Sequence, residues 1–87
     1  MPRVMQADGY GFYIYTHDHP PPHVHVRSSG QACKIAIGDD ETPPELLTQG
    51  TMRRTDAGRA LWIAKDCQEI LLAHWRRHHG PAPDPDG

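Results

Sequence analysis

The stretch HVHVRSSGQACKIAI, residues 23–37, decides the fold that this sequence predicts. Its two arms, residues 23–27 and 32–37, alternate apolar with polar or small side chains, as half-buried strands do. The segment 28–31 between them contains the serines and the glycine that tight turns favour. Because successive side chains of a strand point to opposite faces, we predict an antiparallel hairpin with one apolar face. That face comprises Val24, Val26, Cys33, Ile35 and Ile37.

Two further strands are expected before this hairpin. Residues 10–16, YGFYIYT, are rich in the aromatic and β-branched residues that pleated strands favour. Their alternation separates an apolar face from a face that carries Tyr13 and Tyr15. Val4-Met5-Gln6 is a candidate edge strand, with Asp8-Gly9 as the connecting turn.

The C-terminal half predicts one long helix, from about Asp56 to His79. Apolar residues recur there at steps of three and four, which gives a single apolar stripe. Thr55 or Asp56 is the candidate N-cap. Before this helix, Thr42-Pro43-Pro44-Glu45 is typical of the start of a short helical turn, which Gly50 would end. The stripe comprises Ala57, Ala60, Leu61, Ala64, Cys67, Leu71, His74 and Trp75.

These elements predict an α+β fold, in which an antiparallel sheet of three or four strands packs against the long helix. Residues 1–80 form a single domain in this prediction, and the Pro/Asp-rich tail 81–87 is expected to be disordered. A chain of 87 residues buries a low fraction of its surface, so a homodimer or a partner would add stability. Cys33 and Cys67 fall on inward faces and are expected to be reduced core residues.

The composition argues against several classes of protein. A formal net charge of −2 is too balanced for strong nonspecific binding to nucleic acid. The sequence has no run of roughly 18 apolar residues, the length of a membrane span, and no apolar secretory stretch at its start. The expected compartment is therefore the cytoplasm, and no membrane partner is expected.

The segment HDHPPPHVH, residues 17–25, gathers four of the seven histidines and is where we expect the function to reside. His23 and His25 are two residues apart on a strand, so their rings project from the face opposite the valines or into a groove beside it. The three prolines cannot pair as a central strand and hold the chain extended, which brings His17 and His19 near the strand pair. A cis bond at His19-Pro20 or Pro20-Pro21 is compatible with this connection.

One interpretation of this segment is a metal site. Imidazole is the commonest metal ligand, and three nitrogen or oxygen ligands with an open position are typical of catalytic zinc. His23 and His25 would supply two ligands, and the third could be His17, His19 or Asp18. Zinc or another divalent metal is the cofactor of this alternative alone, since the principal hypothesis involves none. The candidate metal ligands are His17, His19, His23 and His25.

The other interpretations need no metal. Histidine titrates near neutral pH and suits acid/base or phosphate chemistry. The candidate catalytic residues are His23, His25, His19 and Asp18. A polar and aromatic sheet face also suits contact with nucleic acid or a protein partner. Its candidate contacts are Tyr13, Tyr15, Arg27 and Lys34. In a non-catalytic interaction module, the same histidines would only hydrogen-bond to loop carbonyls and shape the surface.

Several motifs resemble one family of small bacterial proteins. They are the start Met1-Pro2-Arg3-Val4, the strand from Gly9 to Tyr15, the block from Asp18 to Val26, and Leu71-x-x-His74-Trp75. Together they resemble domain of unknown function family 4160 over nearly the whole chain up to Gly80. The connection from Gly38 to Thr55 is longer than is usual in the family, and the C-terminal tail is extra.

The resemblance implies a compact α+β protein without an established activity. Members of the family are often encoded beside a second small protein, of domain of unknown function family 2442, which suggests a toxin–antitoxin-like gene pair. The implied partner is that neighbouring protein, and the implied target of a toxin is RNA or the translation machinery. The helix stripe and Trp62 would then form the partner or dimer interface. By the same implication the functional group comprises Asp18, His19, His23 and His25.

Overall fold

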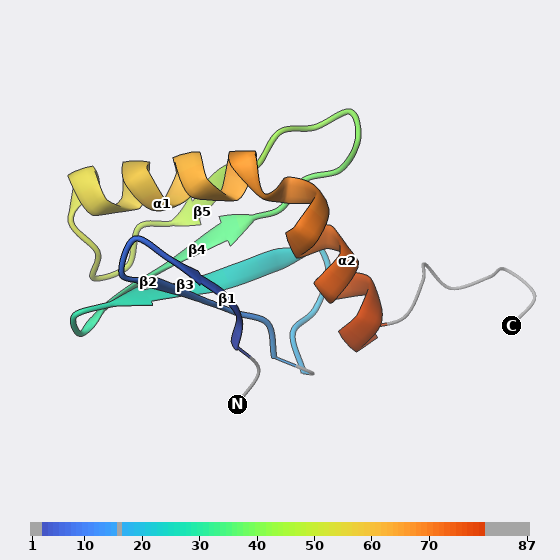
Figure 1. The fold of residues 1–87 in the computed structure, drawn as a ribbon, viewed down its shortest axis with the longest axis horizontal. Helices are drawn as coiled ribbons and strands as arrows, with labels where there is room; N and C mark the ends of the chain where they lie inside the picture. Colours follow the sequence, from blue (N-terminus) through green and yellow to red (C-terminus); the bar gives the residue numbers. More distant parts are fainter. Residues whose placement is uncertain (1–2, 16, 80–87) are drawn as a thin grey trace, which may run out of the picture.

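Figure 1 shows the protein as a computed structural model, which describes residues 3–15 and 17–79. Within these residues the chain has an α+β fold, with five strands followed by two helices. The predicted tail 81–87 and the boundary at residue 80 lie outside the described residues. The elements are β1 (Arg3–Ala7), β2 (Tyr10–Tyr13), β3 (His23–Ser28), β4 (Gln31–Ala36), β5 (Glu45–Thr48), α1 (Arg54–Asp66) and α2 (Gln68–His79).

The strands form one antiparallel sheet in the order β1-β2-β3-β4-β5, so each strand pairs with its neighbours in sequence. β3 and β4 pair along their whole length and are joined by a turn at Ser29-Gly30, where φ is 49° and 80°. A similar turn at Asp8-Gly9, with φ of 51° and 83°, joins β1 to β2. Two consecutive positive φ values match the right-handed twist of flanking strands. The predicted hairpin, edge strand and turns are therefore confirmed.

The two faces of the sheet differ. α1 lies over one face, in contact with β4 and β5, and α2 turns toward the end of the sheet (Figure 1). The side chains beneath the helices are buried as the alternation predicts, and both cysteines are free. Burial raises the pKa of the Cys33 thiol to about 11, which keeps that thiol protonated and unreactive. The largest fully buried side chains are Phe12, Ile14, Ile35, Ile37, Met52, Leu71, Val24 and Val26.

The prediction of three or four strands is imprecise and that of a helical turn after Thr42 is wrong, because residues 45–48 form β5. This strand pairs with β4, with Leu46 opposite Ile35 and Thr48 opposite Lys34. Its backbone groups thus bond to the free edge of β4 instead of to one another in a helix. A four-residue strand with every side chain exposed carries no alternation of burial, so the sequence pattern did not reveal it.

The prediction of one long helix is also imprecise, because the backbone leaves the helical region at Cys67, where φ is −113° and ψ is 20°. The break lets α2 bend toward the end of the sheet, where it buries Leu71, Leu72 and Trp75. The stripe continues across the break at helical spacing, which explains why periodicity did not locate it. Neither α1 nor α2 is long and apolar enough to cross a membrane, and the structure describes no other helix.

α1 begins two residues before the predicted start. Arg53 is the N-cap without a side-chain cap, and its N–H donates to the side-chain oxygen of Gln31 at 2.8 Å. Asp56, a predicted capping residue, instead accepts a hydrogen bond of 2.7 Å from the Tyr10 hydroxyl. This contact ties β2 to the first turn of α1, and it raises the pKa of Tyr10, with burial and the Asp56 charge adding to the effect.

Replacing Tyr10 by phenylalanine removes this hydrogen bond while keeping the buried ring. We expect Tyr10→Phe to lower the free energy of unfolding by about 1–2 kcal/mol near neutral pH. The folded pKa of Tyr10 is raised, so its contribution is present below the ordinary tyrosine pKa of about 10 and is lost as pH rises through the raised value. Urea unfolding should therefore show that the difference in unfolding free energy between the original protein and Tyr10→Phe shrinks above about pH 10. A difference that grows there contradicts this assignment.

A second prediction concerns Gln68, which fastens the connection between β4 and β5 to the start of α2. Its side-chain amide donates to the carbonyls of Ile37, Asp39 and Thr42 at 2.9, 3.0 and 2.8 Å. Gln68→Ala should lower the free energy of unfolding by about 1 kcal/mol. Gln68→Glu should lower it further, because a carboxylate would face three acceptors.

Urea unfolding of both variants tests this order, with Glu69→Gln on the exposed surface as the control. If the glutamate variant is as stable as the alanine variant, the three-carbonyl contact is not formed in solution.

Candidate functional site

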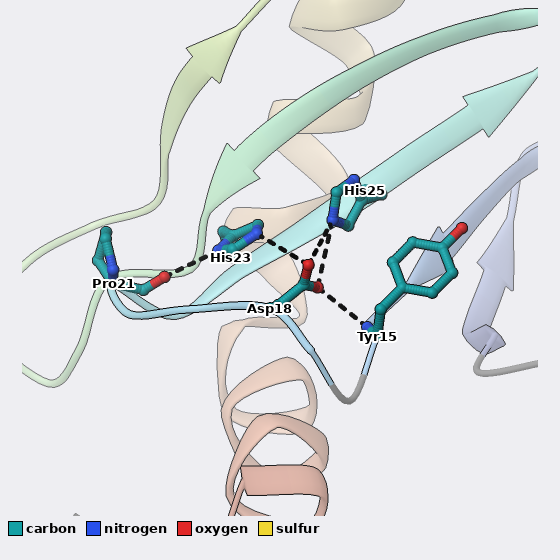
Figure 2. Close-up of polar contacts among 5 residues, drawn as sticks. All are labelled: Tyr15, Asp18, Pro21, His23 and His25. Atoms are coloured by element: carbon teal, nitrogen blue, oxygen red, sulfur yellow. Dashed lines mark hydrogen bonds and ion pairs between the residues drawn. The ribbon is translucent and has the colours of Figure 1, made fainter.

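The carboxylate of Asp18 lies between the imidazoles of His23 and His25 (Figure 2). His25 Nε2 is 3.1 Å from one carboxylate oxygen, Oδ1, and 3.2 Å from the other, Oδ2. His23 Nε2 is 3.6 Å from Oδ1. We call these three residues the histidine–aspartate cluster. It joins the connection after β2 to the first half of β3.

Local hydrogen bonds place each member of this cluster. The Asp18 N–H donates to the Tyr15 carbonyl at 3.0 Å, and Asp18 Oδ2 accepts the Tyr15 N–H at 3.0 Å. The two bonds turn the Asp18 side chain toward β3. His23 begins β3, and its Nδ1 is 2.9 Å from the carbonyl of Pro21. The Pro20-Pro21 peptide bond is cis, and it is one of the two bonds at which the sequence allowed a cis form.

The Pro21 carbonyl fixes the tautomer of His23. A carbonyl can only accept, so His23 Nδ1 carries the proton in this bond. In the neutral ring, Nε2 then has a lone pair, and this lone pair faces Asp18. His25 has the opposite arrangement, because its Nε2 lies against the carboxylate and donates to it. When the His23 ring is neutral, two acceptors, His23 Nε2 and Asp18 Oδ1, therefore face each other at 3.6 Å, whereas a proton on Nε2 would make this contact an ion pair.

Asp18 is held in its charged form. Burial, the largest influence, acts to raise its pKa, but the hydrogen bonds from Tyr15 and His25 outweigh it, and the charges of the two nearby imidazoles add to the lowering whenever these rings are protonated. The pKa of Asp18 is consequently below the ordinary aspartate value. A negative carboxylate with an unprotonated imidazole beside it favours a bound cation or an added proton at this place.

The histidine–aspartate cluster is only narrowly open to solvent. The side chains of His23, Asp18 and His25 are 11%, 13% and 20% exposed. The valines of β3 are buried on the opposite face, as predicted. Both imidazoles were expected on the outward face, but only His25 is partly exposed there. His23 is buried beneath Trp75 of α2, with ring centroids 5.6 Å apart. The bend at Cys67 carries α2 to this position.

The imidazoles of the cluster belong to a continuous row of aromatic and imidazole rings, which the sequence pattern did not reveal. Neighbouring centroids are 3.8 to 6.3 Å apart along this row. Trp75 and His79 were expected only as parts of the helix and its end, and their four-residue spacing was the one sign of contact between them. The rings are, in order, Tyr13, Tyr15, His25, His23, Trp75 and His79.

The other predicted site residues are divided between two places. His17 and His19 are exposed and lie outside the histidine–aspartate cluster, so Asp18 takes the place expected for one of them. Arg27 and Lys34 are exposed on the sheet face that carries His25.

Comparison with known proteins gives one family. The five-stranded sheet, the two helices and the cluster define a small α+β protein with a polar site at one end of its sheet. Residues 9–76 match the family described as Domain of unknown function (DUF4160), and the chain belongs to that family. Neither the curated proteins nor the solved structures contain a match.

Asp18 is expected to stabilise the connection it closes. Asp18→Ala leaves the Tyr15 N–H and the His25 Nε2–H without an acceptor, and should lower the free energy of unfolding by about 1–3 kcal/mol. Asp18→Asn retains an acceptor and should be less destabilised. Urea unfolding in the presence of a chelator compares the variants, and an alanine variant as stable as the original protein would contradict these contacts.

Proposed function

We propose that this protein binds one divalent transition-metal ion through Asp18, His23 and His25. The observation that carries the proposal is the geometry of His23 Nε2 and Asp18 Oδ1, which are held 3.6 Å apart and are both acceptors when the His23 ring is neutral. A cation placed between them would turn this repulsion into two favourable contacts.

The donor set suits such an ion. Each of the three residues offers one ligand atom, and these atoms lie within 4.8 Å of one another. His25 Nε2 would become a ligand once its proton moves to Nδ1 or is released, and the metal would then replace its hydrogen bond to Asp18. Ligands bonded at 2.0–2.1 Å in a tetrahedral site are separated by roughly 3.4 Å, close to the 3.1 and 3.6 Å found around Asp18. Two imidazoles and one carboxylate are typical ligands of zinc, and of iron(II) in sites with open positions.

The surrounding hydrogen bonds also suit a metal. Metal-bound histidines usually donate their second ring N–H to a carbonyl or carboxylate, which fixes the ring and its tautomer. The bond from His23 Nδ1 to the Pro21 carbonyl has this form. The Tyr15 N–H likewise steadies the second oxygen of Asp18. Three protein ligands would leave a position for water or a small ligand.

The small exposed area of the histidine–aspartate cluster favours an ion over a polynucleotide. An RNA phosphodiester would need both imidazoles within hydrogen-bond reach, whereas His23 is covered by Trp75. A bare ion needs only a narrow path. The burial of Asp18, His23 and His25 therefore supports metal binding better than direct acid/base catalysis on RNA.

The implications of the family resemblance stay predictions beside this proposal. They are a toxin–antitoxin-like gene pair and a small partner protein from the neighbouring gene. The cytoplasmic location and the homodimer, which hydropathy and chain length suggest, also stay predictions. A bound metal is compatible with either member of such a pair.

The experiment is a titration of the untagged, chelator-treated protein with Co²⁺ and Zn²⁺, followed by cobalt absorption and calorimetry. We expect one ion per chain. His25→Ala and Asp18→Asn should each weaken binding by at least about tenfold, the lower limit for losing even an outer-shell partner. Thermal unfolding in chelator checks that the variants fold.

The matched control is His74→Ala with His78→Ala, which removes two histidines spaced one turn apart on α2 and outside the cluster. This variant should bind the metal as the original protein does. An original protein that binds no ion, or a His25→Ala variant that binds as tightly, would overturn the proposal.

A further inference from the structure

The sheet face opposite α1 carries a row of side chains, one from each strand. Direct partners in antiparallel strands lie on the same face, so the pairing places these side chains side by side. The row contains two cations with an aromatic ring and an imidazole between them. In strand order it comprises Arg3, Tyr13, His25, Lys34 and Thr48. We call this side of the sheet the open face.

A hollow of about 440 Å³ lies on the open face beside this row. Arg3, Arg27 and Tyr13 line it, together with the serines of the β3–β4 turn. Gly11 and Ala32 are the direct partners of Arg27, and their lack of bulk leaves the space on either side of that guanidinium. None of the described residues that line the hollow is acidic.

Tyr13 offers an aromatic surface at this hollow. Its ring lies nearly parallel to that of Tyr15, at an angle of 9° and a centroid distance of 6.3 Å. The Arg27 guanidinium carbon is 5.7 Å from the centre of the Tyr13 ring. A Cβ on Gly11 would approach the Tyr13 ring to 2.9 Å, so the glycine lets the ring lie close to the sheet.

We propose that the open face binds single-stranded nucleic acid, with phosphates at Arg3, Arg27 and Lys34 and a base against Tyr13. Cations beside an exposed aromatic ring on a sheet are the combination by which proteins hold unpaired strands. A polyanion fits the charge of the hollow better than a protein surface of mixed charge.

The acidic residues behind the net charge of −2 lie mostly elsewhere. Asp39, Asp40 and Glu41 precede β5, whereas Asp56, Asp66 and Glu69 lie on the helices. The remaining acidic residues of the strands and their connections do not line the hollow; they are Asp8, Asp18 and Glu45. A balanced chain thus presents a locally cationic hollow on its open face.

The test is fluorescence anisotropy with labelled oligouridine RNA and oligothymidine DNA, in chelator, so that its outcome is independent of the metal proposal. We expect binding that weakens as salt rises. Arg27→Ala with Lys34→Ala should weaken it at least fivefold, and should reduce the slope of log affinity against log salt by about 0.7 for each phosphate that is no longer neutralised. Tyr13→Leu should weaken binding about tenfold, because the base can no longer stack.

The matched control removes two exposed cations from the helix side, with Arg54→Ala and Arg59→Ala on α1. This variant should bind the oligonucleotides as the original protein does, while circular dichroism checks the fold of every variant. The proposal is overturned if neither oligonucleotide binds at low salt, or if the α1 variant loses as much affinity as the open-face variant.

Discussion

The contact between the Asp18 carboxylate and the two imidazoles of β3 is the constraint on which the end of the sheet depends. Asp18 accepts from Tyr15 and His25, so it fixes the proline-rich connection against β3. The Pro21 carbonyl then orients His23, whose ring lies beneath Trp75 of α2. One carboxylate therefore links the proline-rich connection, β3 and α2. When the His23 ring is neutral, its Nε2 lone pair points at the negative charge of this carboxylate.

Much of the fold could be predicted because alternation and turn chemistry act locally. The valines of β3 are buried and the hairpin closes at Ser29-Gly30, as the pattern requires. β5 and the break at Cys67 could not be predicted, since each is decided by tertiary contacts. The first satisfies the edge of β4, and the second brings the apolar stripe of α2 to the end of the sheet.

The grouping of side chains around the candidate site could be predicted from the sequence only in part. Two-residue spacing correctly paired His23 with His25. No periodic pattern could choose Asp18 over His17 and His19, because the choice depends on the paired hydrogen bonds with Tyr15. The cover provided by Trp75 was equally hidden, as it follows from the bend between the helices.

In its neutral form His23 turns an unprotonated Nε2 toward Asp18, and nitrogen NMR of the imidazoles in metal-free protein detects this tautomer. The spectra are recorded at a pH above the ordinary histidine pKa of about 6.5. We expect opposite tautomers, with the proton on Nδ1 of His23 and on Nε2 of His25. A His23 ring that carries its proton on Nε2 and donates it to Asp18 would contradict the account.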